Sequence, residues 1–382
     1  MKTSGDILPG ILEFRRRLHQ VPELAGEERE TSRLIRERLK PLGFELFPPF
    51  LETDVVALLR GGKGPGRNVT LRADTDALSV EEATGVPYRS THPGKMHACG
   101  HDAHISMVMG AAELLAARRD EFAGSVRFVF QPGEENRAMA RDLLAADALE
   151  NPKADVVAAL HGMPGLPVGM LGVRTGAIMA SSAHFRITLH GRGGHSSTPH
   201  LSRNPVTAAA ALIHELEGLA GRTVNSQVPS VLTVCRVAGG ELENVIPESA
   251  VVAGTARSLS DRADAGLEAG LRRTVAAVAA AREVSADVDY RLRYPVTVNA
   301  PGPTDLARKV IRSLGLACRE LPESAMAADD FAWYLKRYPG VYLRIGTGEN
   351  SPELHNSKFL FPEEALRPGI EYLTEFALAT LR

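Results

Sequence analysis

The sequence predicts an α/β fold in which a larger domain with a mostly parallel central sheet is interrupted by a smaller α+β two-layer sandwich. In the first half of the chain, short and almost wholly apolar strands alternate with helices, as in a sheet covered on both faces. Near residue 180 the strands change to an apolar–polar alternation, which is typical of half-exposed strands. Helix and strand patterns of the first kind return after Pro303. We therefore assign residues 1–180 and 293–382 to the larger domain and residues 181–292 to an insertion.

The N-terminal region predicts two helices. Ile7, Ile11 and Leu18 form one apolar stripe, which Pro22 ends, and a charged segment over residues 27–39 indicates the second helix. Both helices precede the first expected strand.

A third helix is expected over residues 103–118, with Asp102 as its N-cap. The glycine cluster at 61–66 lacks the Gly-Lys-Ser/Thr ending of a phosphate loop, so we interpret it as a hairpin turn. The strands of the larger domain are expected at 55–59, 69–71, 125–130, 156–160 and 341–345.

The insertion predicts the order β-α-β-β-α-β, which is typical of a small α+β sandwich. Its expected strands and helices are 185–189, 205–219, 231–237, 250–256, 261–282 and 284–292.

Bulk composition excludes several classes of protein. The 382 residues are 44% apolar and 24% charged, which is ordinary for a globular protein, and a net charge of −2 gives no field that favours nucleic acid or an anionic membrane. No apolar run is long enough to span a bilayer, and the first residues have no apolar core of signal-peptide length. Three cysteines are too few for a disulfide framework, so we expect a reducing compartment, the cytoplasm.

Residues 96–104, Met-His-Ala-Cys-Gly-His-Asp-Ala-His, place one thiol and three imidazoles within a short segment. A chain with few cysteines has little reason to place Cys99 beside so many histidines unless something binds there. Together with nearby acids, this donor set suits Zn²⁺, Mn²⁺, Co²⁺ or Ni²⁺ better than Ca²⁺ or Mg²⁺. The segment therefore predicts part of a transition-metal site.

Further donors follow the expected strands. These are Asp74, Asp76, Glu134, Glu135, His161 and His355. Because ligands bind at the carboxyl ends of parallel strands, we expect these side chains to gather at one edge of the sheet. Taken singly, Cys99 could be an inert buried thiol, Glu134-Glu135 a solvated helix start and His161 a loop histidine. Since Glu134 and Glu135 are adjacent and cannot easily point alike, one would be a metal ligand and the other a base.

The insertion carries three more candidates. His195 lies in a glycine-rich turn, where backbone can approach a ligand closely, and its imidazole could donate a hydrogen bond to a substrate oxygen. The alternative is a plain hairpin turn with an exposed histidine. Asn244 and Arg257 could hold a carboxylate, which arginine binds bidentately.

These motifs resemble the M20 metallopeptidase superfamily, in particular its amidohydrolase branch of hippurate hydrolases, N-acyl-amino-acid deacylases and auxin-conjugate hydrolases. Residues 96–104 resemble the specific motif MHACGHDxH, and the resemblance covers nearly the whole chain. The other matching segments are 72–78 (RADxDALP), 131–135 (QPxEE), 160–162 (LHxxP), 191–199 (GxGGHxxxP), 244–247 (NVIP), 327–331 (EDF) and 354–355.

The resemblance implies a role for each candidate. Two divalent ions (Zn, Mn, Co or Ni) would be bound by Cys99, His101, Glu135, His161 and His355. Glu134 would be the general base and then the acid, and Asp76 would support the metal site. His195 would be an oxyanion donor, in many relatives from the partner subunit, and Asn244 and Arg257 would bind the substrate's free carboxylate.

The implied protein is a homodimer or higher oligomer with the insertion as lid and dimerisation domain. Its substrate would be a small N-acyl amino acid, hippurate-like or N-acetylated, which hydrolysis converts to a carboxylic acid and a free amino acid. A dipeptidase or carboxypeptidase of the same superfamily stays open as the alternative.

The chain departs from the family pattern at two places. Relatives usually carry a glycine-rich stretch where residues 136–141 are bulky and basic, and Ser79 replaces a proline. The proposed ligands are unaffected, but we expect the acyl pocket or its lid to differ.

Overall fold

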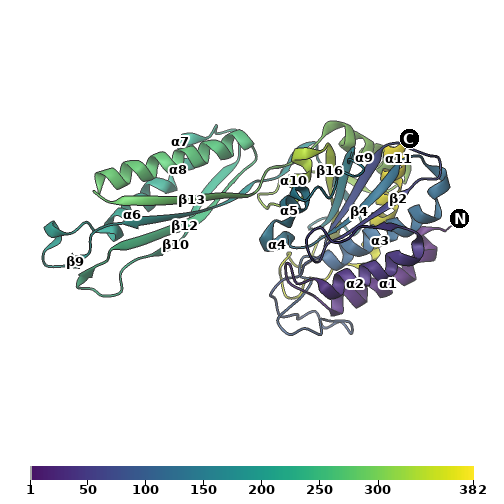
Figure 1. The fold of residues 1–382 in the computed structure, drawn as a ribbon, viewed down its shortest axis with the longest axis horizontal. Coiled ribbons are helices and arrows are strands. Elements are labelled where there is room, and N and C mark those ends of the chain that lie inside the picture. The colour runs from purple at the N-terminus through teal and green to yellow at the C-terminus, as the bar shows by residue number, and fades with distance from the viewer. Residues whose placement is uncertain (1) are drawn as a thin grey trace. The chain divides into compact units, whose positions relative to one another are not determined.

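The computed structural model describes residues 2–382, which divide into two compact units. The first unit comprises the residues up to Ile178 together with Val298–Glu323 and Asp329–Arg382. The second comprises Met179–Thr297 and Ser324–Ala328, so five residues from beyond the insertion belong to it. Figure 1 labels the elements of both units.

The first unit is built on an eight-stranded sheet with the order β1-β2-β4-β3-β5-β16-β6-β15. Its central neighbours β4, β3, β5 and β16 are parallel, whereas β1, β2 and the β16–β6 pair are antiparallel, so the expected mostly parallel sheet is confirmed. Every residue of β3 and β4 is buried, as their apolar sequences predicted. The strands are β1 Glu45–Leu46, β2 Val55–Arg60, β3 Asn68–Asp74, β4 Ser125–Gln131, β5 Val156–Pro164, β6 Leu171–Val173, β15 Cys318–Glu320 and β16 Gly340–Gly348.

Helix α3, His101–Ala117, is the central helix of this unit. It is apolar almost all round, and it packs against β3, α1 (Ser4–Gln20) and α11 (Leu366–Leu381), which bury it. Gly110 of α3 and Gly369 of α11 let these two helices approach closely, because a Cβ at either position would collide with Ile370 or Met107 of the other helix. The remaining helices of the unit are α2 Arg29–Leu39, α4 Glu134–Arg137, α5 Met139–Ala145, α9 Pro301–Ser313 and α10 Ala332–Arg337.

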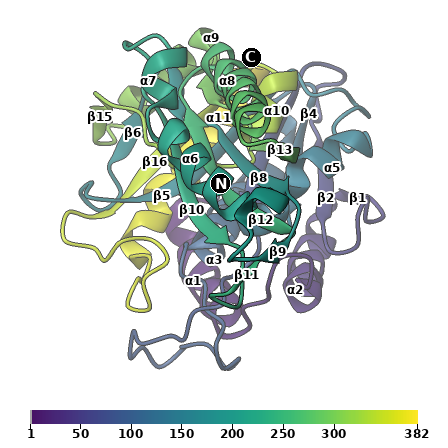
Figure 2. The ribbon, with the colours of Figure 1, turned by 90° about the vertical axis from the view of Figure 1, so that its left-hand side faces the viewer.

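The second unit has a four-stranded antiparallel sheet with the order β10-β12-β8-β13. Helices α6 (Pro205–Glu217) and α8 (Asp261–Ala281) pack on one face, where alternate residues of β8 are buried, and the expected order of strands and helices is present (Figures 1 and 2). The other elements of this unit are α7 Leu219–Thr223, β8 Ser182–His190, β10 Ser230–Ala238, β12 Ser249–Ser258, β13 Ser285–Tyr294 and a small pair of β9 Gly194–His195 with β11 Val245–Ile246. At the boundary between the two units, β7 Gly176–Met179 pairs with β14 Thr297–Asn299.

Two local predictions were wrong. Asp102 does not cap α3, because the helix begins at His101 after the left-handed Gly100, and the Asp102 carboxylate instead binds Arg15 and His19. His161 does not follow a strand; β5 continues to Pro164 and contains it.

None of the helices among residues 2–382 has the length and apolar character needed to cross a bilayer.

Candidate metal centre

Three donors from two segments converge in the first unit. One ligand atom each of Cys99, His101 and Glu135 lie within 4.8 Å of one another. Cys99 and His101 meet because Gly100 between them has φ +83°, a conformation that residues with a side chain rarely adopt. Glu135 reaches them from α4, which follows the carboxyl end of β4. The edge of the sheet that the sequence predicted therefore holds the donors.

His161 and His355 join the same cluster. The Nε2 atom of His161 lies 3.5 Å from the sulfur of Cys99, and that of His355 lies 3.2 Å from Oε1 of Glu135. The backbone N–H of His355 donates to the carbonyl of Ala98 at 2.8 Å, which ties its loop to the residue before Cys99. The structure thus brings together all five side chains that the resemblance implied as metal ligands.

The histidine nitrogens are arranged for a metal ion. Nδ1 of His101 donates to the backbone carbonyl of Asp76 at 2.8 Å, which leaves the lone pair of Nε2 facing the cluster. This buried Nε2 has no hydrogen-bond partner among residues 2–382. An orphaned imidazole nitrogen beside a thiol and a carboxylate fits a divalent transition metal.

The electrostatics also favour a cation. Burial raises the pKa of the Cys99 thiol well above its usual range, and the carboxylates of Glu135 and Glu134 raise it further. Burial alone would lower the pKa of His101, but Asp74 and Asp76 outweigh it and raise that pKa to about 10. Without an ion the cluster therefore holds protons, and a metal would displace them.

Asp76 braces this cluster through both carboxylate oxygens. They accept the backbone N–H groups of Glu134 and Glu135 at 3.1 and 3.0 Å, while the Asp76 carbonyl fixes His101. One buried side chain thus positions the two acids and one imidazole.

Glu134 is buried beside a second pair of acids. Its carboxylate lies within 4.8 Å of those of Asp329 and Asp330. Burial, followed by the charges of Asp329, Glu135 and Asp330, raises the pKa of Glu134 well above its ordinary value. The preceding Gly133 is held by a hydrogen bond from its N–H to buried Glu28 at 2.9 Å.

The hydrogen-bond network around Arg72 that supports these acids was not predicted from the sequence. Arg72 donates to Asp74 at 2.6 Å, to Asp330 at 2.7 Å and to Gln131 at 3.0 Å, so it neutralises part of this acidic edge. The EDF-like match at 327–331 marks Asp330 in the sequence, but no sequence feature links it to Arg72.

His104 belongs to the same support. Its Nδ1 bonds Asp74 at 2.7 Å, and its Nε2 accepts the N–H of Gly162 at 3.0 Å. Since both nitrogens are occupied, the grouping of Asp74, His101, His104 and His161 is better explained as bracing of β5 than as a second ion site.

In the second unit, His195 and Asn244 are neighbours. His195 on β9 pairs with Val245 on β11, and the N–H of Ser196 donates to the carbonyl of Asn244 at 3.1 Å. The N–H of Ser197 donates to Nδ1 of His195 at 3.1 Å, so the neutral ring carries its proton on Nε2, which can donate.

Arg257 lies at the other end of this unit. It stands eight residues beyond Ser249 on β12, which is about 27 Å of strand, and it donates to the carbonyl of Met326 at 3.0 Å. A single chain therefore does not bring Asn244 and Arg257 together.

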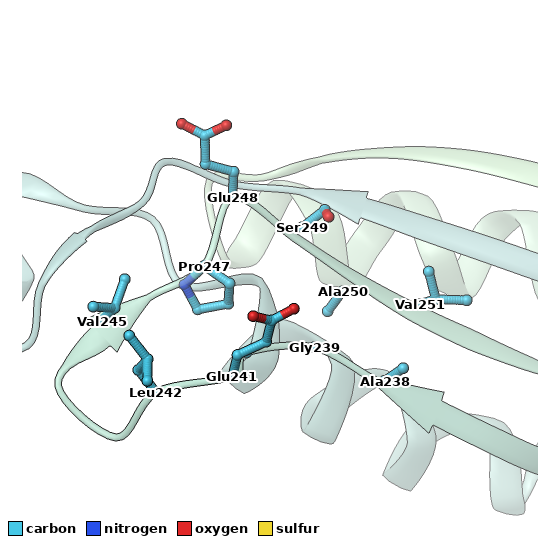
Figure 3. Close-up of a pocket in the computed structure, with 11 residues that line it drawn as sticks. Ala238, Gly239, Glu241, Leu242, Val245, Pro247, Glu248, Ser249, Ala250 and Val251 are labelled. Atoms are coloured by element: carbon cyan, nitrogen blue, oxygen red, sulfur yellow. The ribbon is translucent and has the colours of Figure 1, made fainter.

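An open groove of about 560 Å³ flanks β11 (Figure 3). Its lining combines apolar side chains such as Leu242 and Val245 with Glu241 and Glu248, and it contains none of the predicted site residues. The imidazole, thiol and carboxylate cluster of the first unit is separate from it.

Comparisons with known proteins agree with this geometry. Residues 70–379 match peptidase family M20/M25/M40. The chain is 36% identical to an N-acetylcysteine deacetylase of Bacillus subtilis over 97% of each chain, and 35% identical to thermostable carboxypeptidase 2 of Saccharolobus solfataricus over 94% of this chain and 92% of that protein.

Solved structures agree as well. A putative aminohydrolase from methicillin-resistant Staphylococcus aureus superposes with a TM-score of 0.95 at 28% identity, covering 100% of this chain and 98% of that one. A dinuclear metal-binding M20 peptidase from Bacillus subtilis gives 0.87 at 33% identity, covering 99% of each. The resemblance seen in the motifs is confirmed: the chain belongs to peptidase family M20/M25/M40.

Proposed function

We propose that this protein is a metal-dependent amidohydrolase that cleaves N-acyl amino acids to a carboxylic acid and a free amino acid. The observation that carries the proposal is the convergence of five metal-ligand side chains beside one buried carboxylate, Glu134. Relatives named as deacetylases of N-acetylcysteine and N-acetyldiaminopimelate, and an auxin-conjugate hydrolase of Arabidopsis thaliana, support the substrate class.

Cys99, His101, Glu135, His161 and His355 would hold two divalent ions of Zn, Mn, Co or Ni. When bound, such ions polarise the amide carbonyl and make water more acidic. Asp76 keeps the ligands in place through its hydrogen bonds to Glu134, Glu135 and His101.

Glu134 takes a proton from the attacking water and then delivers it to the leaving amine. A raised pKa lets a buried carboxyl hold that proton between the two transfers. The Nε2–H of His195 donates to the developing oxyanion, an interaction typically worth about 3–4 kcal/mol. Arg257 binds the carboxylate of the amino-acid half.

The protein would act as a homodimer in the cytoplasm. Because Arg257 lies about 27 Å of strand beyond Ser249, and His195 and Asn244 belong to the β9–β11 pair that precedes Ser249, one copy would supply Arg257 and another would supply His195 and Asn244 to each site.

A carboxypeptidase or dipeptidase is the second candidate, and the thermostable carboxypeptidase relatives favour it. Metal-reconstituted protein should be assayed for amine release from N-acetyl, N-benzoyl and dipeptide substrates with the same C-terminal residue. Faster cleavage of the acyl amino acids supports the amidohydrolase. Faster cleavage of dipeptides selects the peptidase, and cleavage of neither contradicts both.

A further inference from the structure

The strongest unexplained feature of the first unit is the guanidinium of Arg137. It ends α4, two residues after Glu135, at the point where the chain departs from the family pattern. The side chain is exposed and makes no hydrogen bond or ion pair with any residue in 2–382. An arginine with unused donors so close to the proposed ligands calls for a binding role.

The opposite loop leaves room for this cation. Gly26 has φ +81°, and a Cβ at that position would lie 2.9 Å from Cζ of Arg137. Any other residue at position 26 would displace the guanidinium. The loop continues at Glu28, which accepts the N–H of Gly133, so the two segments that flank Arg137 are tied together.

The backbone on the other side also keeps Arg137 where it is. Ala138 has φ +55°, a strained conformation for a residue with a side chain, and it separates α4 from α5. This break ends α4 at Arg137 and turns the following chain into α5.

The acids beside Gly26 and on α5 are already paired. Glu27 beside Gly26 binds Lys95 at 3.1 Å, and Asp142 binds Arg141 at 3.3 Å. Meanwhile the sheet edge behind Arg137 is strongly acidic, with Asp76, Glu134 and Glu135 among its carboxylates. The divalent ions of the proposed function would neutralise these carboxylates, which leaves Arg137 as an additional positive charge for an anionic substrate group.

We infer that Arg137 selects N-acyl groups that end in a carboxylate, as in N-succinyl amino acids. The inference rests on the proposed function, in which Arg257 of the second unit takes the carboxylate of the amino-acid half. The acyl half is then left to the first unit, where Arg137 can form a bidentate pair with its terminal carboxylate. Water adds, the C–N bond breaks, and the products are succinate and the amino acid.

The test compares N-succinyl and N-butanoyl derivatives of one amino acid, which match in chain length and differ in charge. Wild-type protein should have the higher kcat/KM for the succinyl substrate. Arg137→Gln should lower the succinyl-to-butanoyl ratio at least about tenfold, as loss of a charge-assisted hydrogen bond does, and Arg137→Lys should restore part of it. Arg141→Gln, an equally exposed arginine on the next helix, is the matched control and should leave the ratio unchanged.

Two results would overturn the inference. The first is that Arg137→Gln lowers kcat/KM equally for the succinyl and butanoyl substrates. The second is that Arg137→Gln lowers kcat/KM only for N-acetyl-glutamate relative to N-acetyl-norvaline, which would place the cation at the amino-acid half of the substrate. Calorimetric titration with succinate and butanoate separates this question from turnover. If neither amide is cleaved but succinate binds more weakly to Arg137→Gln than to wild type, the proposed function fails and the anion subsite stands. If both amides are cleaved and Arg137→Gln binds succinate as wild type does, only the subsite fails.

Discussion

Glu134 combines two properties that a general base for amide hydrolysis needs. Its carboxylate lies beside the ligand cluster, and its burial among Asp329, Asp330 and Glu135 makes it a stronger base than an exposed glutamate. Arg72, bonded to Asp330, limits the mutual repulsion of these acids. The residue can therefore accept a proton and later release it.

Glu134→Gln should abolish most turnover while leaving metal binding intact. The amide keeps the shape of the side chain but cannot take a proton, so kcat should fall by about 10²–10⁴-fold. Metal content, measured by elemental analysis after gel filtration, should match that of wild type. Glu13→Gln, the same change at an exposed position of α1, is the control. Near-normal kcat in Glu134→Gln would remove this residue from the mechanism.

At the scale of elements, the start of α3 depends on Gly100. Its φ of +83° lets Cys99 and His101 face the same cluster, and a Cβ there would lie 2.7 Å from Cδ2 of Phe361. Gly85 offers a comparison, because its φ of +76° is similar but a Cβ at that position would have no neighbouring atom within 4 Å.

Gly100→Ala should therefore destabilise the protein more than Gly85→Ala. Both variants suffer backbone strain of about 1–3 kcal/mol, and only the first adds a clash in a packed region. Urea unfolding of the metal-loaded proteins measures the difference, and metal affinity should fall only in Gly100→Ala. Equal stability and equal affinity of the two variants would show that the site does not depend on this turn.

The contact between α1 and α3 includes a buried pair that responds to pH. His19 bonds Asp102 at 2.9 Å and Glu82 at 3.2 Å. Burial opposes the charged form of His19, but these carboxylates outweigh it and raise its pKa from 6.5 to about 9. The folded state thus binds this proton more tightly than the unfolded state, and the resulting stability is complete below pH 6.5 and lost as pH rises through 9.

His19→Gln should lower the free energy of unfolding by roughly 2–3 kcal/mol at pH 6 and by much less at pH 9.5. Urea unfolding at a series of pH values gives the wild-type minus variant difference directly. His214→Gln, on an exposed face of α6, should show no such trend. A difference for His19→Gln that stays constant from pH 6 to 9.5 would mean that the pair is not charged in the folded protein.

For the whole molecule, the sequence predicted those parts of the fold that depend on local pattern. The long strands and α3 were found because their apolar runs and stripes have a clear period. β6 and β15, with three residues each, are too short to show one. Cys235 and Cys318 are exposed on the edge strands β10 and β15, and their place at a sheet edge is set by tertiary packing.

The candidate site likewise contains residues that local sequence pattern reveals and residues that only tertiary packing brings together. The donors could be predicted because Cys99 and His101 lie in one distinctive segment at the start of α3, and because the others lie near the carboxyl ends of recognisable strands that share one edge. The bond from Arg72 to Asp330 joins residues 258 positions apart, and only tertiary packing determines it. The separation of Asn244 from Arg257 likewise follows from how β12 runs through its sheet, which residue types alone do not reveal.

That separation leads to a prediction about two copies of the chain. If each site takes His195 from one copy and Glu134 from the other, then His195→Ala and Glu134→Gln proteins should both be nearly inactive alone but active when co-refolded. A mixed dimer has one site with both residues intact, so random pairing should recover about a quarter of wild-type activity. Mixing two preparations of the same variant is the control. Recovery that requires co-refolding and is absent when the folded proteins are simply combined supports a stable shared site. No recovery at all would mean that one chain builds its site alone, and a His195→Ala protein that is active by itself would remove His195 from the reaction.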